Sequence, residues 1–149
     1  LGLLHKTIRE NSTMSRMGLP DYVVTMRKPG ACEERVTHGD DLPVLMWQKY
    51  ASPIWDDINQ SRTLNKLPAR DENDEKHMCP LQLDVIERCI HLWTNKGDLV
   101  FSPFTGIGSE GYSAIKMGRR FVGTELKPQY FDLACMNIND ALIEQTGLF

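Results

Sequence analysis

The residues after position 80 alternate between helical and strand periodicity, and this alternation most constrains what the chain can fold into. Apolar side chains recur at helical spacing between Pro80 and Gly97, and the short apolar run Leu99-Val100-Phe101 follows them. The expected elements are, in order, a helix between Pro80 and Gly97, a strand at 99–101, a helix at 109–117, a strand at 121–125 and a helix that begins at Pro128. This order predicts an α/β layer with a parallel sheet and a right-handed crossover.

The first seventy residues are less regular. Residues 21–26 predict a strand that ends in the basic turn Arg27-Lys28-Pro29-Gly30, and residues 44–47 predict a second, short strand. The rest of this part is punctuated by prolines, and it is followed by the charged run 70–76, which is typical of a solvated loop.

Composition limits the class of protein. The chain has 149 residues and a formal charge of -3, which neither indicates nor excludes a nucleic-acid partner. It has no apolar run near the roughly 20 residues of a membrane span and no signal-peptide order, so we expect a soluble, cytoplasmic protein with no membrane partner. Leu1 in place of an initiating Met predicts a part of a longer protein. No metal site is expected, because the four cysteines form no pair at zinc-ligand spacing: Cys32, Cys79, Cys89 and Cys135.

The run Gly106-Ile107-Gly108-Ser109-Glu110-Gly111 is a G-x-G-x-x-G motif between an expected strand and an expected helix. Glu125 ends the next expected strand, nineteen residues after Gly106. Glycines permit a tight turn close to a ligand, and a carboxylate at this place can accept both hydroxyl protons of an adenosine ribose. The alternative is a turn whose glycines serve only the packing of helix on strand.

Two kinds of cofactor use this arrangement. A nicotinamide or flavin dinucleotide needs a second mononucleotide-binding half downstream, and only twenty-four residues follow Glu125. S-adenosylmethionine needs the same carboxylate and glycine turn but no pyrophosphate site. The sequence therefore favours S-adenosylmethionine.

Four consecutive segments then resemble the amino-methylating DNA methyltransferases, which modify adenine N6 or cytosine N4. Ser102-Pro103-Phe104-x-Gly106-x-Gly108 resembles the D-P-F-x-G-x-G cofactor motif of that family. Residues 76–90 resemble its K-H-P-x-x-x-P…E-R-x-I segment, residues 118–125 resemble G-R-x-F-I-G-x-E/D, and the family's x-P-x-Y-F-x-x-A is matched by Pro128, Tyr130, Phe131 and Ala134. The likeness covers residues 76–139 strongly and residues 4–30 weakly.

The resemblance implies a Rossmann-like S-adenosylmethionine-dependent methyltransferase fold, α/β in class and incomplete in this chain. It implies that residues 1–149 are one domain, the C-terminal portion of a circularly permuted enzyme, with cofactor binding in residues 76–149. The implied activity is methylation of an exocyclic amine in double-stranded DNA, adenine N6 ahead of cytosine N4, as in restriction-modification systems; a homodimer is a candidate assembly. The implied cofactor residues are His77, Cys79, Pro80, Ser102, Pro103, Phe104, Thr105, Gly106, Gly108, Ser109 and Glu125.

The sequence departs from the family pattern at three cofactor-side positions and at the catalytic loop. Ser102 replaces the usual Asp, which reduces an acidic contact toward the methionine end of the cofactor to a hydroxyl, and Met78 and Gln82 replace two prolines. The family's D/N/S-P-P-Y/F/W loop has no good copy. The nearest candidate for catalysis is Ser52-Pro53-Ile54-Trp55, against the alternative that Trp55 packs a loop on the sheet and the true loop precedes Leu1.

Residues 31–70 are a candidate target-recognition segment, because they are irregular and punctuated by prolines, contain basic side chains and lie between two cofactor-side elements. Arg62 and Lys66 are the expected phosphate contacts, and a solvated surface is the alternative. Two further functions remain open: methylation of a substrate other than DNA, and a non-catalytic remnant that binds DNA or a partner.

Overall fold

The structure is a computed structural model that describes residues 9, 20–31, 34–38, 42–64 and 80–147. The chain forms two compact units, Leu1–Glu33 and Glu34–Phe149, and each is described by itself. Among the described residues, none of the helices is both long and apolar enough to pass through a bilayer. The charged run 70–76 lies outside the described residues.

In the first unit, residues 20–31 are exposed and carry no strand. The prediction of a strand at 21–26 is therefore wrong for this structure, although the apolar side chains that suggested it are present. Tyr22 and Met26 are 81% and 92% exposed. A strand exists only through hydrogen bonds to a neighbouring strand, and the described part of this unit provides none.

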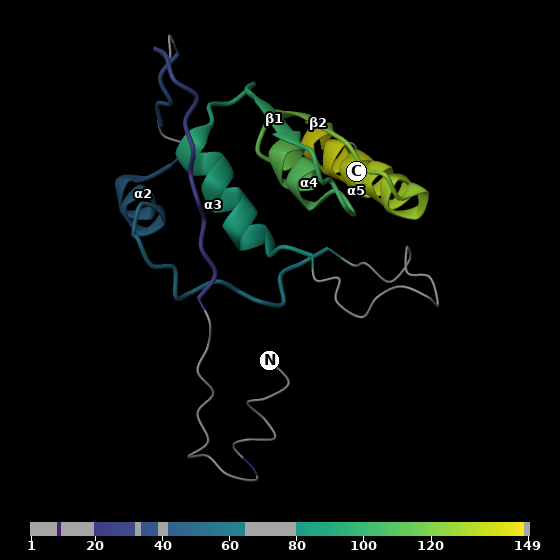
Figure 1. The fold of residues 1–149 in the computed structure, drawn as a ribbon, viewed down its shortest axis with the longest axis horizontal. Coiled ribbons are helices and arrows are strands. Elements are labelled where there is room, and N and C mark those ends of the chain that lie inside the picture. Colours follow the sequence, from purple (N-terminus) through teal and green to yellow (C-terminus); the bar gives the residue numbers. More distant parts are fainter. Residues whose placement is uncertain (1–8, 10–19, 32–33, 39–41, 65–79, 148–149) are drawn as a thin grey trace. The chain divides into compact units, whose positions relative to one another are not determined.

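The second unit contains all the helices and strands with assigned bounds, in the order helix, helix, strand, helix, strand, helix (Figure 1). They are α2 (Val44–Tyr50), α3 (Leu83–Trp93), β1 (Leu99–Ser102), α4 (Ser109–Lys116), β2 (Arg120–Gly123) and α5 (Pro128–Thr146). The two strands pair in parallel, with Leu99 opposite Arg120 and Ser102 opposite Gly123. The predicted alternation after position 80 and its parallel sheet are thus confirmed.

Several element boundaries and one element type differ from the sequence prediction. Helix α3 begins at Leu83 rather than near Pro80, because Gln82 before it has an extended backbone. Strand β2 ends at Gly123, which leaves Thr124 and Glu125 in the turn that follows. Residues 44–47 form a helix, not a strand: the Pro43 carbonyl accepts hydrogen bonds from the Met46 and Trp47 N–H groups at 2.9 Å. A four-residue apolar run fits either structure, and local hydrogen bonding decided this one.

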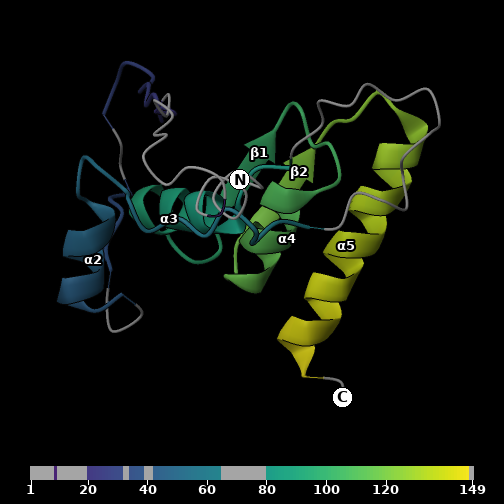
Figure 2. The same cartoon turned by 90° about the horizontal axis from the view of Figure 1, so that it is seen from below.

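The core lies where α3 and α4 meet one face of the sheet. Helix α4 lies between α3 and α5 and contacts both (Figure 2). Its Ala114 is fully buried against Ile86 and Ile90 of α3, and Val100 and Phe121 of the strands pack on the same cluster. Full burial of a side chain such as Ile86 or Ile90 contributes about 1.5–3 kcal/mol. The strand residues that point to the other face are exposed: Leu99, Phe101 and Val122.

The turn into α4 requires glycine for two separate reasons. Gly108 precedes the helix with φ of 88°, in the left-handed region that other residues rarely adopt. A Cβ placed on Gly108 would also lie 3.0 Å from the Ala134 Cα of α5, too close to fit without backbone movement. The sequence motif therefore records both the sharp turn and the contact between the turn and α5.

Comparison of two glycine variants separates these reasons. Gly97→Ala is the control, because Gly97 has a φ of 82° but open space around its missing Cβ. We expect Gly97→Ala to lower the free energy of unfolding by about 1 kcal/mol, the cost of left-handed backbone alone. Gly108→Ala should lower it by about 2–3 kcal/mol, since overpacking adds to that cost. Urea unfolding measures both, and equal losses would show that α5 does not constrain the turn.

Candidate functional site

Two turns meet at the carboxyl end of the sheet, and backbone hydrogen bonds join them. The first, residues 103–108, connects β1 to α4; the second, residues 124–127, connects β2 to α5. The Thr105 N–H donates to the Thr124 carbonyl and the Thr124 N–H donates to the Ser102 carbonyl, both at 3.0 Å. The Thr124 hydroxyl also donates to the Pro103 carbonyl at 2.8 Å. This is the edge at which open α/β sheets bind ligands.

Glu125 is bonded by the backbone of both turns. One carboxylate oxygen accepts the Gly106 N–H at 2.7 Å, and the other accepts the N–H groups of Leu126 at 3.0 Å and Lys127 at 2.9 Å. A carboxylate offers about four lone-pair positions, so these bonds leave little free capacity. Glu125 therefore holds the glycine turn in place in addition to any ligand contact that it makes.

Two large apolar side chains stand in solvent beside this carboxylate. Phe104 in the first turn is 86% exposed, and Leu126 in the second is fully exposed. An isolated exposed Leu needs no explanation, but an exposed aromatic ring and an exposed Leu in the two turns beside one carboxylate provide apolar contact surface. The site thus combines hydrogen-bond acceptors with apolar contact area.

The structure brings most of the predicted cofactor residues together. Residues 102–109 run from the end of β1 through the turn to the start of α4, and Ser102, Thr105 and Ser109 are buried there, while Glu125 reaches this turn from the second one. Pro80 is half-buried before α3, whereas His77 and Cys79 lie outside the described residues. The structure also adds Glu110, in the first turn of α4, which the sequence interpretation did not single out although it lies inside the glycine motif. Glu110 is half-buried, and this burial raises the pKa of its carboxyl.

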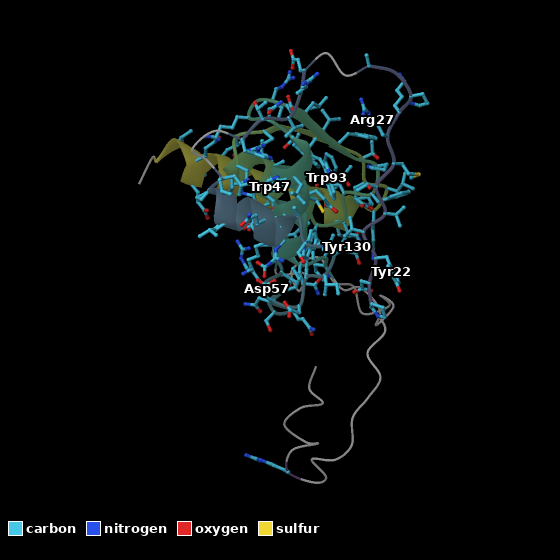
Figure 3. The ribbon with its side chains drawn as sticks, turned by 90° about the vertical axis from the view of Figure 1, so that its left-hand side faces the viewer. Tyr22, Arg27, Trp47, Asp57, Trp93 and Tyr130 are labelled. Atoms are coloured by element: carbon cyan, nitrogen blue, oxygen red, sulfur yellow. The ribbon has the colours of Figure 1, made fainter. Side chains whose placement is uncertain are left out.

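The Ser52-Pro53-Ile54-Trp55 segment packs against α3. The Trp55 indole N–H donates to the Tyr50 carbonyl at 2.9 Å, and the Arg88 guanidinium lies over the Tyr50 and Trp55 rings, 5.1 and 5.4 Å from their centres. Arg88 is buried and pairs with Asp57 at 2.8 Å. The contacts described for Trp55 are therefore packing contacts, and they are made with a helix rather than with the sheet. Two other tryptophans, Trp47 of α2 and Trp93 of α3 (Figure 3), are nearly half exposed.

Arg62 is occupied by carboxylates. Its guanidinium donates to Asp84 at 2.5 Å and to both oxygens of Glu87 at 2.6 and 2.7 Å. The hydrogen bonds that Arg62 donates to Glu87 and Asp84 raise its pKa above its usual range. The group of three carries a net negative charge, which does not suit contact with a phosphate. The expected role of Arg62 in phosphate binding is therefore not supported, and Lys66 lies outside the described residues.

Comparison with known proteins places the chain among DNA methylases. The family model for N6 and N4 methyltransferases, described as DNA methylase, matches residues 23–136. The type II methyltransferase M.BglI of Bacillus subtilis is 30% identical over 126 residues, which are 84% of this chain and 32% of that protein. The orphan methyltransferase M.BamHII of Bacillus amyloliquefaciens is 37% identical over 51 residues, 34% of this chain and 19% of that protein.

A solved structure has the same fold. TTHA0409 of Thermus thermophilus, assigned as a DNA modification methylase, superposes with a TM-score of 0.57 at 25% identity over 83% of this chain and 49% of that chain. Its complex with S-adenosyl-L-methionine gives a TM-score of 0.58 at 24% identity over 87% of this chain and 50% of that chain. The fold is therefore the Rossmann-like methyltransferase fold, incomplete in this chain. The chain spans about a third or less of the length of these curated relatives and about half of the solved structure.

The ion pair of Asp57 predicts a pH dependence of stability. Hydrogen bonds from Lys49 and then Arg88 lower the pKa of Asp57 to about 2. The pair therefore stabilises the fold fully above the ordinary carboxyl pKa of about 4, and this contribution is lost as the pH falls toward 2. We expect Asp57→Asn to lower the melting temperature at pH 7, and the difference from the parent protein to shrink between pH 4 and pH 2.

Asp56→Asn is the matched control, because Asp56 is the neighbouring exposed carboxylate and has no ion pair among the described residues. Its melting temperature should follow that of the parent protein at every pH. Thermal unfolding monitored by circular dichroism measures all three proteins. A difference for Asp57→Asn that stays constant from pH 7 to pH 2 would contradict the assignment.

Proposed function

The chain belongs to the family of N6 and N4 DNA methylases, and we propose that it supplies the cofactor-binding part of an enzyme that methylates an exocyclic amine of DNA. The single observation that carries this proposal is the Glu125 carboxylate bonded to the Gly106 N–H at the carboxyl end of two parallel strands. It joins the two elements that an adenosine-containing cofactor needs, a glycine turn and an acidic acceptor.

The proposed cofactor is S-adenosylmethionine, which would supply an activated methyl group. Glu125 would accept one ribose hydroxyl with its remaining lone-pair position, and Phe104 and Leu126 would pack on the adenine ring. The backbone of the turn would approach the ligand closely because Gly106 and Gly108 have no side chains. The proposed site comprises His77, Cys79, Pro80, Ser102, Pro103, Phe104, Thr105, Gly106, Gly108, Ser109 and Glu125.

The proposed substrate is double-stranded DNA, with adenine N6 ahead of cytosine N4. The family and the names of the curated relatives support DNA as the substrate class. The target amine lies inside the duplex, so the base must leave the stack before its nitrogen can meet the methyl group in line. Methylation of another substrate, or a role in binding without catalysis, remains the alternative function.

We assign the catalytic loop to a part of the protein outside these residues. The only candidate here, Ser52-Pro53-Ile54-Trp55, offers an indole that already packs on Arg88 and bonds to Tyr50. The Ser52 hydroxyl likewise donates to the Ile54 carbonyl at 3.0 Å. Because these groups are used within the loop and against α3, they are poorly placed to hold a flipped base and its amine.

Calorimetry with S-adenosylmethionine tests the cofactor site. The parent protein should bind, and Glu125→Ala should lose about 1–3 kcal/mol of binding free energy, the worth of hydrogen bonds to a charged acceptor. Because Glu125 also holds the turn, Phe104→Ala is the second variant. Its ring is exposed, so the fold should keep its melting temperature while binding weakens by about 1 kcal/mol. Asp140→Ala, an exposed carboxylate on α5, should change neither quantity.

No heat of binding from the folded parent protein at millimolar cofactor would refute the proposed site. Unchanged binding by both Glu125→Ala and Phe104→Ala would place the cofactor elsewhere on the protein.

Methyl transfer to DNA tests the activity. We expect the enzyme that contains these residues to convert adenine to N6-methyladenine in duplex DNA, measured by mass spectrometry of digested nucleosides. Residues 1–149 alone should bind the cofactor but transfer no methyl group. N4-methylcytosine as the product would overturn the choice of base. Transfer by residues 1–149 alone would return Ser52-Pro53-Ile54-Trp55 to the catalytic role.

A further inference from the structure

Glu110 is the one half-buried carboxylate of the described residues that receives no hydrogen bond from another residue. Asp84 and Glu87 bind Arg62, Asp98 accepts the Asn95 N–H at 2.8 Å, and Glu125 accepts three backbone N–H groups. The Glu110 carboxyl is bonded only to its own backbone N–H. This carboxylate is therefore partly withdrawn from water and has no partner among the described residues besides its own backbone, which leaves its oxygens available to a ligand.

The position of Glu110 relates it to the cofactor site. It directly follows Ser109 in the first turn of α4, where the glycine turn ends at the carboxyl end of the sheet. Ala114 lies one helical turn later on the same side of α4, and it packs against Leu83 and Ile86 of α3. Glu110 therefore lies on the side of α4 that faces α3, the helix preceded by Pro80 of the proposed site.

The cofactor has a cationic end that needs a carboxylate. S-adenosylmethionine carries an α-ammonium group, an α-carboxylate and a sulfonium, which give a net positive charge, and buried cations are stable only when paired. Ser102 provides only a hydroxyl, and the lone pairs of Glu125 are largely taken by backbone N–H groups. Of the acidic groups described at this edge of the sheet, Glu110 alone has its carboxylate oxygens available.

We propose that the Glu110 carboxylate binds the α-ammonium group of S-adenosylmethionine and so supplies the acidic contact that Ser102 lacks. This inference rests on the proposed function of the same site. Burial raises the pKa of Glu110, which means that the charged carboxylate costs stability in the protein alone. A residue that costs stability without a partner is a signature of a binding group that is completed by its ligand.

Binding of three ligands to Glu110→Gln tests the contact, because the amide keeps the size of the side chain and removes its charge. S-adenosylmethionine and S-adenosylhomocysteine both carry the α-ammonium group, and 5′-methylthioadenosine has the adenosine without the amino acid. We expect Glu110→Gln to bind the first two about tenfold more weakly, as for one lost hydrogen bond between charged groups. Binding of 5′-methylthioadenosine should change less than twofold. The melting temperature should stay the same or rise.

Glu144→Gln is the matched control, the same substitution at an exposed residue of α5 that pairs with Lys116. It should leave the affinities for all three ligands unchanged. Equal affinities of Glu110→Gln and the parent protein for every ligand would overturn the proposal. Equal weakening for all three ligands with a lower melting temperature would assign Glu110 to the stability of α4. Weaker binding of S-adenosylmethionine alone would assign Glu110 to the sulfonium. Either result would overturn the α-ammonium contact. No binding of any ligand by the parent protein would instead refute the proposed cofactor site itself.

Discussion

The hydrogen bond from the Gly106 N–H to the Glu125 carboxylate is the interaction on which the rest of the site depends. Parallel strands have no short hairpin to join their ends, so the loops that follow them can drift apart unless something connects them. Here a carboxylate on the second loop binds the backbone of the first, and the Leu126 and Lys127 N–H groups hold that carboxylate in place. A charged acceptor makes these bonds stronger than bonds between neutral groups.

The sequence was sufficient to predict those elements whose structure is set by residues close together along the chain. Helical spacing located α3, α4 and α5, and the apolar run before the glycines located β1, because a buried helix face and a buried strand each leave a local pattern. The positions of the glycine turn and of Glu125, each after an expected strand, could be predicted from the same order of elements. The strand predictions for residues 21–26 and 44–47 were wrong for different reasons. A strand at 21–26 needs a partner strand, which no local pattern can supply, and the apolar run 44–47 is too short to distinguish a helix from a strand.

The charged contacts of the second unit lay beyond sequence reasoning. Arg62 lies more than twenty residues from its partners Asp84 and Glu87. Only the folded chain shows that this basic residue of an irregular segment pairs with the carboxylates of a helix. The same holds for Arg88, whose guanidinium joins the segment after α2 to α3 through Asp57 and two aromatic rings. Charge in such a segment therefore indicates packing as readily as it indicates a nucleic-acid surface.

Helix α5 sets the position of the glycine turn although it supplies none of the proposed cofactor residues. The Asn137 amide donates to the Ile107 carbonyl at 2.8 Å, while the Ala134 backbone leaves no room for a side chain at Gly108. These two contacts of α5 therefore fix the position of the turn relative to the helix. Sequence change along its inner side is limited to residues that keep this spacing. A larger residue at position 134 would displace the glycine turn from outside the turn itself.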